Sequence, residues 1–286
     1  MTNLRPTLSP LLVEQSVRTA LEEDLGRAGD ITSQATIAAD RRAIVHVVSR
    51  QKGIVAGLPL LASAFRTLDP AMDIQLKFND GDPIEPGDVL ARIEGNARAI
   101  LAAERVGLNF LMHLSGIATL TAAYAAQIAH TDARVCCTRK TLPGLRVVGK
   151  YAVRCGGGSN HRFGLDDAVL IKDNHIAIAG GVASAIEAAK AHCGHLVQVE
   201  VEVDTLVQLE EALAAGPDCI LLDNMGPDQL IEAVRINNGR CKLEASGNID
   251  LTTIKAVAET GVDYISTSKV TMAAPTLDIG LDIEID

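Results

Sequence analysis

Residues 197–223 read VQVEVEVDTLVQLEEALAAGPDCILLD, and this stretch decides the fold class. An apolar run over 197–203 and another over 219–223 enclose a helix candidate over 205–215. A strand, a helix and a second strand at this spacing predict an α/β protein in which the two strands are parallel.

The same unit repeats from residue 134 to residue 268. The apolar runs are 134–138, 168–172, 197–203, 219–223, 242–246 and 264–268, and further helix candidates cover 227–236 and 251–260. Six repeats are two short of a complete eight-stranded barrel, so we expect an open, incomplete parallel α/β barrel. Polar residues stand where these runs end, which is the edge at which parallel barrels assemble their active sites. They are Arg139, Lys140, Lys172, Glu202, Asp223, Ser246 and Ser268.

The first 116 residues follow another pattern. Ser9-Pro10 predicts a helix start and Gly26 its end, with Val13, Val17 and Leu21 on one face. Residues 43–95 hold short apolar runs separated by turn signals, which predict antiparallel strands.

A long helix is expected from Ala97 to about Leu114, apolar nearly all round and therefore buried. Its polar stripe consists of Arg98, Arg105 and Asn109. A buried arginine needs an anionic partner. That partner is either a ligand or an acid such as Glu104.

Basic residues are concentrated between positions 133 and 165. The segment holds seven of them and no acid, whereas the formal net charge of the 286-residue chain is −10. They are Arg134, Arg139, Lys140, Arg146, Lys150, Arg154 and Arg162. Gly156–Gly158 precede Asn160, His161 and Arg162, so the backbone can approach a ligand closely. The pattern predicts a small ligand with several carboxylates or phosphates.

Glu200 and Glu202 alternate with valines, so both carboxylates face the interior of the predicted barrel. Lys140, Lys172 or a divalent cation would serve as their partner. With Asp223 on the next strand, this oxygen-only set favours magnesium, and a structural ion-pair network is the alternative. Ser246-Gly247-Asn248 stand at a strand end before a helix, which suits a terminal phosphate.

Composition argues against other classes. Four Phe, three Tyr and no Trp give few stacking platforms for nucleic acid. No uninterrupted apolar stretch approaches the ~20 residues of a membrane span, and residues 1–10 do not resemble a secretion signal. None of the six cysteines forms a pair with the two-residue gap of a zinc or redox site, so we expect a cytoplasmic protein.

Two short motifs are interpreted as chance matches. Residues 144–150 fit a nucleotide-triphosphate loop, but Tyr151 replaces its final Ser or Thr. His192 and His195 stand at a predicted helix end without further ligands at metal spacing.

Over nearly its whole length the chain resembles the quinolinate phosphoribosyltransferases, which are decarboxylating nicotinate-nucleotide pyrophosphorylases of NAD synthesis. The segments that carry the resemblance are 104–105, 114–119, 138–146, 150–153, 156–158, 160–162, 170–175, 200–203 and 221–224. The resemblance implies an N-terminal α/β sandwich domain over 1–116, an open barrel over 117–274 and a tail, 275–286, that returns to the first domain.

The resemblance also implies a reaction and a site. Quinolinate and 5-phosphoribosyl-1-pyrophosphate would give nicotinate mononucleotide, pyrophosphate and carbon dioxide in a homodimer that shares Arg105 across its interface. Quinolinate would be bound by Arg105, Arg139, His161, Arg162 and Lys172. The phosphoribosyl donor and its Mg²⁺ would be bound by Lys140, Glu202 and Asp223, with Thr138, Ser246, Gly247, Asn248 and Ser268 as further substrate contacts. Lys140, Lys172, Glu202 and Asp223 would be the catalytic residues, and any metal contact of the two acids could be indirect, through the donor.

The chain departs from the family pattern at Ser268-Lys269-Val270, where the family usually has Gly-Ala-Leu. Three other functions stay open. They are a relative that acts on another pyridine or in molybdenum-linked metabolism, a barrel lyase with a Schiff base on Lys140 or Lys172, and a non-catalytic dicarboxylate sensor.

Overall fold

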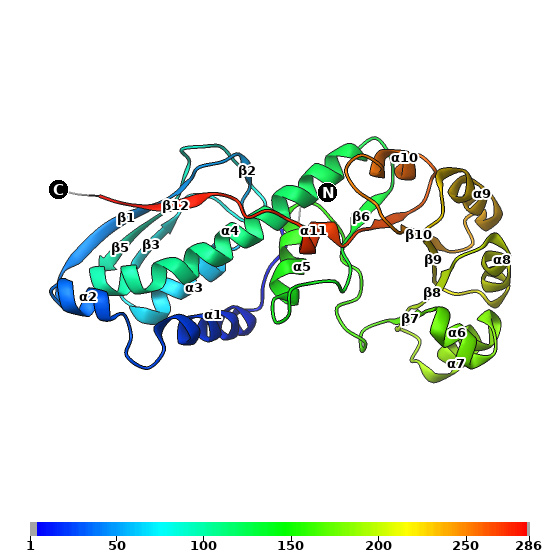
Figure 1. Cartoon of the computed structure of the whole chain (residues 1–286), viewed down its shortest axis with the longest axis horizontal. Helices are drawn as coiled ribbons and strands as arrows, with labels where there is room; N and C mark the ends of the chain where they lie inside the picture. Colours follow the sequence, from blue (N-terminus) through cyan, green and yellow to red (C-terminus); the bar gives the residue numbers. More distant parts are fainter. Residues whose placement is uncertain (1–4, 285–286) are drawn as a thin grey trace. The chain divides into compact units, whose positions relative to one another are not determined.

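The structure is a computed structural model that describes residues 5–284, and it contains two compact units (Figure 1). The first comprises the described residues up to 120, residues 148–157 and the described residues from 274 onward. The second comprises residues 121–147 and 158–273.

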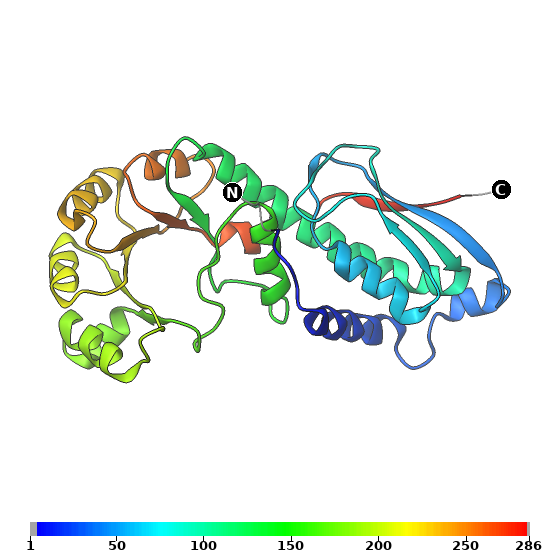
Figure 2. The same cartoon turned by 180° about the vertical axis from the view of Figure 1, so that it is seen from behind.

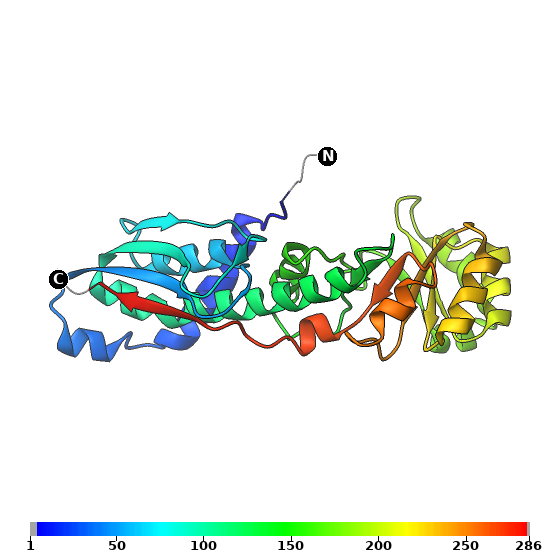
Figure 3. The ribbon, with the colours of Figure 1, turned by 90° about the horizontal axis from the view of Figure 1, so that it is seen from above.

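The first unit is an antiparallel sheet with helices. Its elements are α1 (Pro10–Leu25), α2 (Ile31–Thr36), β1 (Arg42–Ser49), β2 (Gly53–Ile54), α3 (Leu58–Leu68), β3 (Asp73–Leu76), β4 (Pro83–Ile84), β5 (Val89–Asn96), the greater part of α4 (Ala97–Gln127), most of α5 (Arg146–Cys155) and β12 (Ile279–Ile283). The main sheet has the order β12-β1-β5-β3, and β2 pairs with β4. Val47 of β1 lies opposite Leu281 on one side and Ala91 on the other. The tail thus supplies a strand, visible beside β1 in Figure 3.

An aliphatic core joins this sheet to α3 and α4. Val45 and Val47 of β1 are fully buried with Phe65 of α3 and Leu111 of α4. The helix predicted from Pro10 is confirmed, and Val13, Val17 and Leu21 form its buried face. Gly26 ends it at a φ of 53°, whereas the Ser9 side chain makes no capping hydrogen bond.

Three expectations for this unit need correction. The segment expected to hold only strands also contains α3, which is buried along most of its length. Helix α4 continues to Gln127 instead of ending near Leu114. Its polar stripe is not buried, because Arg105 and Asn109 are exposed and Arg98 is only partly buried. The partner of Arg98 is a backbone group, since its Nε donates to the carbonyl of Ile37 at 2.8 Å.

Helix α4 is long and apolar enough to cross a membrane by length and composition alone. Within its apolar 18-residue window, however, 61% is buried inside the protein. A core helix passes the same test, so this property does not indicate a membrane span.

The second unit is a parallel sheet followed by helices. Its elements are β6 (Arg134–Cys136), β7 (Val169–Ile171), α6 (Asp173–Ala179), α7 (Val182–His192), β8 (Val199–Val203), α8 (Leu206–Ala215), β9 (Cys219–Asp223), α9 (Pro227–Asn237), β10 (Lys242–Ser246), α10 (Ile254–Ala258), β11 (Tyr264–Ser266) and α11 (Lys269–Met272). The strand order is β6-β11-β10-β9-β8-β7, and all five pairs are parallel.

The sheet does not close, because β6 and β7 stand at opposite ends of the strand order. Helices α6 to α9 lie on the outer side of the strand row (Figures 1 and 2). The free side of β6 is bridged by Ser159, whose amide donates to Val135 at 2.8 Å and whose carbonyl accepts from Cys137 at 3.1 Å. The expected α/β fold with an open, incomplete barrel is confirmed. The helix expected over 251–260 is shorter, because residues 251–253 form a turn around Asp250.

Candidate active site

The C-terminal ends of the parallel strands surround a cavity of about 450 Å³ in the second unit. Most of its lining residues were predicted from the sequence. Those are Thr138, Arg139, Lys140, His161, Arg162, Lys172, Glu202, Asp223 and Ser246. Leu170, Leu221, Glu244 and Ser266 complete the lining. The structure thus brings the polar residues at the strand ends together around one cavity, as the sequence predicted.

An adjoining cavity of about 290 Å³ shares Thr138, Lys140, Asp223, Ser246 and Ser266 with the first. It is lined further by Asn224, Gly247, Asn248, Ile249, Thr267, Ser268 and Lys269. We call the larger cavity the carboxylate pocket and the smaller one the phosphate cradle. Arg105 belongs to α4 in the first unit and is not among the residues that line either cavity.

Arg162 gives the carboxylate pocket its strongest requirement for an anion. Its Nη1 donates to the carbonyl of Ala168 at 3.0 Å, while its buried Nε has no partner among residues 5–284. Burial lowers the pKa of the Arg162 guanidinium, and the positive charge of Arg139 lowers it further, whereas Glu200 raises it. A carboxylate placed here would satisfy a buried donor and separate two like charges.

Arg146 belongs to the same basic segment but has a structural role. Its guanidinium donates to Thr141 Oγ1 at 3.1 Å and to the carbonyl of Phe163 at 2.9 Å. It therefore holds the segment after β6 against the segment after His161. Lys150 and Arg154 lie on α5 in the first unit, so the basic segment supplies fewer cations to the pocket than its sequence suggests.

Glu202 is paired with Lys172, which is one of the partners expected for the two glutamates of this strand. The Lys172 ammonium contacts Glu202 Oε2 directly, and the Glu202 side chain is only 13% exposed. A Schiff-base lysine must offer a neutral amine, which a carboxylate partner disfavours. The pair therefore argues against the lyase alternative at Lys172.

Glu200 and Glu244 contact His161 at the wall of the carboxylate pocket, which His161 and Glu244 line. His161 Nε2 lies 2.9 Å from Glu200 Oε2 and 3.8 Å from Glu244 Oε1, and Cys219 donates its thiol to Glu200 at 3.4 Å. The backbone amide of Arg162 donates to His161 Nδ1 at 2.8 Å. An accepting Nδ1 assigns the proton to Nε2, so His161 donates to Glu200 rather than presenting a free cation to a ligand.

Glu244 was not predicted, although the sequence contained the signal. It stands two residues before Ser246 on β10, so the alternation of a strand places both side chains on one face. The same reasoning that selected Glu200 and Glu202 would have found it.

The phosphate cradle is built on unusual backbone. Asn224, Gly247 and Asn248 have φ values of 54°, 106° and 51°. A Cβ on Gly247 would clash with the Asn224 side chain and come within 2.9 Å of its Cα, so only glycine fits. In the described part of the chain, the backbone amides of Gly247, Asn248 and Ser268 donate to no protein acceptor. Three available amides around one cavity suit a phosphate.

The Ser268-Lys269-Val270 departure leaves the cradle intact. Ser268 lines the cavity in an ordinary right-handed conformation, with φ −75° and ψ −15°, and Val270 is fully buried. Lys269 Nζ lies 3.2 Å from Asp250 Oδ2.

The residues also permit a test of the magnesium expectation. Glu202 is engaged by Lys172, and Asp223 accepts a hydrogen bond from the Asn224 amide group at 2.6 Å. Within residues 5–284, the grouping of three ligand atoms close enough to share an ion is His161, Glu200 and Glu244, and its histidine carries the proton on the nitrogen that faces the acids. Two separate carboxylates fit magnesium that arrives on substrate phosphates, because Mg²⁺ is commonly bound by one or two carboxylates plus phosphate oxygens.

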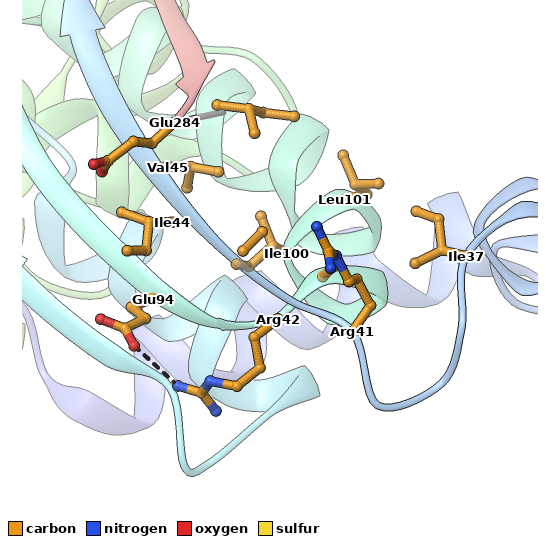
Figure 4. A pocket seen from close by; sticks show the side chains of 12 residues that line it. Ile37, Arg41, Arg42, Ile44, Val45, Glu94, Ile100, Leu101 and Glu284 are labelled. Carbon is orange, nitrogen blue, oxygen red and sulfur yellow. Dashed lines mark hydrogen bonds and ion pairs between the residues drawn. The ribbon is translucent and has the colours of Figure 1, made fainter. Parts of the chain in front are cut away.

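A hollow of similar volume, about 460 Å³, lies in the first unit between β1 and α4 (Figure 4). Its lining is mostly aliphatic, with Ile44, Ile100 and Leu101, and Arg42 closes one side by pairing with Glu94 at 3.4 Å. None of the predicted site residues lines it.

An open parallel α/β barrel with a cationic cavity and an amide-lined cavity at the C-terminal ends of its strands is the arrangement in which barrel enzymes assemble their active sites. Residues 30–115 match the N-terminal domain, and residues 117–282 the C-terminal domain, of quinolinate phosphoribosyl transferase. The chain therefore belongs to the quinolinate phosphoribosyltransferase family, and it is an enzyme of the pentosyltransferase class.

Individual relatives agree with this assignment. The chain is 43% identical to the probable nicotinate-nucleotide pyrophosphorylase [carboxylating] of Bacillus subtilis, over 92% of this chain and 90% of the relative. It is similar to the solved nicotinate-nucleotide pyrophosphorylase of Francisella tularensis, with a TM-score of 0.94, 39% identity and coverage of 99% and 100%. The Pyrococcus furiosus enzyme of the same name, at 18% identity, a TM-score of 0.71 and coverage of 99% and 78%, shows the shared fold.

Proposed function

We propose that this enzyme transfers the phosphoribosyl group of 5-phosphoribosyl-1-pyrophosphate to the ring nitrogen of quinolinate, with loss of carbon dioxide. The products are nicotinate mononucleotide, pyrophosphate and carbon dioxide, which places the reaction in NAD biosynthesis. The observation that carries the proposal is the two-part site. A pocket with a buried, unpartnered arginine donor adjoins a cradle with three available amides.

Quinolinate is a planar dicarboxylate, so its recognition requires cations on one side of the pocket. Arg139, Arg162 and Lys172 are the lining cations that we assign to it, and the unpartnered Arg162 Nε supports the assignment. His161 is assigned to the wall of the quinolinate site as a neutral ring, because its one N–H is donated to Glu200 and its Nδ1 accepts from the Arg162 amide. We assign Arg105 to the same substrate from a second subunit, because its side chain is exposed on α4.

The phosphoribosyl donor occupies the junction of the two cavities. Lys140 and Asp223 line both, so they are placed for the pyrophosphate and the ribose, together with Glu202. We assign the terminal phosphate to the cradle, whose lining includes Thr138, Ser246, Gly247, Asn248 and Ser268. Glu202 and Asp223 would hold magnesium, directly or through the bound donor, and the ion would neutralise charge on the pyrophosphate.

The chemistry needs no protein nucleophile. The bond between the anomeric carbon and the pyrophosphate oxygen breaks, and its electron pair leaves with pyrophosphate. Glu202 and Asp223 stabilise the positive charge that develops on the sugar, whereas Lys140 stabilises the leaving group. The ring nitrogen of quinolinate supplies the new bond and becomes cationic, which stabilises the carbanion left by carbon dioxide until that carbon takes up a proton.

Three further properties are proposed with the activity. The enzyme is a homodimer that shares Arg105, it acts in the cytoplasm, and its sequence domains divide as 1–116 and 117–274 with the tail from 275 attached to the first. Within the second sequence domain, residues 117–120 and 148–157 belong to the first compact unit. The exposed Arg105 and the pairing of β12 with β1 support the first and the last of these.

The test is an assay of purified protein with the phosphoribosyl donor, magnesium and either quinolinate or nicotinate. Pyrophosphate and carbon dioxide should appear together with quinolinate, and nicotinate should give little pyrophosphate because it lacks the second carboxylate. Equal turnover of nicotinate would contradict the proposal. Borohydride trapping of a carbonyl substrate on Lys140 or Lys172 would instead establish the lyase alternative.

A further inference from the structure

The phosphate cradle has one cation that the carboxylate pocket does not share. Lys140 lines both cavities, whereas Lys269 lines only the cradle. The other charged residue of the cradle is Asp223, which repels phosphate. A terminal phosphomonoester carries up to two negative charges, so amides and hydroxyls alone leave most of that charge without a counter-ion.

Lys269 is held by a partner that can release it. Its Nζ lies 3.2 Å from Asp250 Oδ2, and the two side chains are 45% and 37% exposed. The other Asp250 oxygen accepts from the amide of Thr252 at 2.9 Å and from its hydroxyl at 2.6 Å. Asp250 therefore keeps two hydrogen-bond donors of its own loop if the lysine leaves. Exposed ion pairs of this kind contribute little, so the exchange costs little.

The backbone that carries Lys269 is fixed, so the exchange needs only a side-chain rotation. The Lys269 amide donates to Thr267 Oγ1 at 3.3 Å, and the next residue, Val270, is fully buried. Thr271 is also buried and hydrogen-bonds to the carbonyl of Lys140 at 2.8 Å. Ser268, which precedes the lysine, already lines the cradle.

We propose that Lys269 is a further phosphate-binding residue, which leaves Asp250 and pairs with the terminal phosphate of the ribose substrate and of the nucleotide product. The inference rests on the proposed function, and it deepens that function by assigning a contact where the family usually has alanine. Lys269 thereby adds a second cation to a cradle whose other lysine, Lys140, is shared with the carboxylate pocket.

Direct binding of ribose 5-phosphate tests the proposal without any turnover. Calorimetric titration should show that Lys269→Met weakens binding about tenfold, which corresponds to about 1.4 kcal/mol, while Lys269→Arg stays within about threefold of wild type. The loss should shrink at high ionic strength, because the contact is between charges. The matched control is Lys255→Met, since Lys255 is an exposed lysine of α10 outside both cavities.

Steady-state kinetics give an independent readout. Lys269→Met should raise the KM for the phosphoribosyl donor and leave the KM for quinolinate within about twofold, because the variant changes only the phosphate end of the site. Wild-type affinity for ribose 5-phosphate in Lys269→Met would overturn the inference, as would failure of the wild-type protein to bind ribose 5-phosphate. A wild-type protein that binds ribose 5-phosphate through Lys269 but does not convert quinolinate would contradict the proposed function alone.

Discussion

The hydroxyl of Thr271 donates a hydrogen bond of 2.8 Å to the backbone carbonyl of Lys140, across 131 residues of sequence. Thr271 belongs to α11, which follows the last strand of the parallel sheet, and Lys140 belongs to the segment after β6, the first strand. The bond therefore ties the end of the second unit to its beginning. The lysine is exposed, and its position over both cavities depends on where this carbonyl is held.

Replacing Thr271 by valine should loosen Lys140. Valine keeps the shape of threonine but leaves the carbonyl without this donor, so the free energy of unfolding should fall by about 1 kcal/mol. The KM for the phosphoribosyl donor should rise several-fold, and the KM for quinolinate should change little. Urea unfolding and steady-state kinetics measure both effects, with Thr19→Val on the exposed face of α1 as control. Equal changes in both KM values would show that the bond supports the whole site.

Asp80 should give the first unit a distinctive dependence on pH. It is 9% exposed and accepts hydrogen bonds from the amide of Gly57 at 2.8 Å, the amide of Leu58 at 3.1 Å and the hydroxyl of Tyr151 at 2.6 Å. Burial raises the pKa of Asp80, and these hydrogen bonds lower it only in part. Its contribution to stability is therefore complete below the unfolded value of about 3.9 and is lost as pH rises through the folded value.

The measurement is the free energy of unfolding of wild type, Asp80→Asn and Asp30→Asn between about pH 2.5 and pH 7, which spans the unfolded pKa of about 3.9 on both sides. The advantage of wild type should shrink as pH rises. Asp30→Asn is the matched control with the opposite sign, because hydrogen bonds from Ser33 lower the pKa of Asp30 and its contribution is lost as pH falls. The same slope in both variants would contradict this account of Asp80.

Arg105→Ala should abolish turnover, and mixing with a second inactive variant should restore it. In a heterodimer of Arg105→Ala and Lys172→Ala chains, one site combines an intact Lys172 with the arginine of the other chain. Random exchange between the chains of a twofold dimer gives about a quarter of wild-type activity. Verified exchange without recovered activity would show that Arg105 acts within its own subunit.

Asp223→Asn should separate the two substrates. The residue lines both cavities on the side that we assign to the donor, and a carboxylate there repels a dicarboxylate. Calorimetry with magnesium should show weaker donor binding, while quinolinate affinity stays within about threefold, a change below about 0.7 kcal/mol. Loss of quinolinate binding with unchanged donor binding would mean that the two halves of the site have been exchanged.

The second unit follows closely from its sequence because each strand is a separate apolar run with polar residues at its end. Strands β8, β9 and β10 have unmistakable periodicity, and the rule for parallel sheets then places Glu202, Asp223 and Ser246 at one edge. The roles of these residues in binding and catalysis stay predictions, since geometry alone does not assign them.

Helices α3 and α4 differ from the sequence prediction for different reasons. Helix α3 carries a helical signal, with Leu58, Leu61 and Phe65 on its buried face, but it is short and lies among turn signals that favour strands. In α4, Ser115-Gly116 resembles a helix end. A Cβ at Gly116 would clash with the Pro275 carbonyl and lie 3.0 Å from its carbon, so the glycine allows the tail to pass the helix. Such a contact between distant residues has no local signature.

The unclosed sheet also bears on how the protein behaves at high concentration. Free edges of sheets invite strands from other molecules and so promote aggregation, yet β6 and β7 are only three residues long. The outer side of β6 is already occupied by Ser159, which leaves β7 as the exposed edge of this sheet. A three-residue edge offers few peptide groups to template an intermolecular ladder, so this sheet keeps an accessible rim for its ligands and still presents little edge for pairing with another molecule.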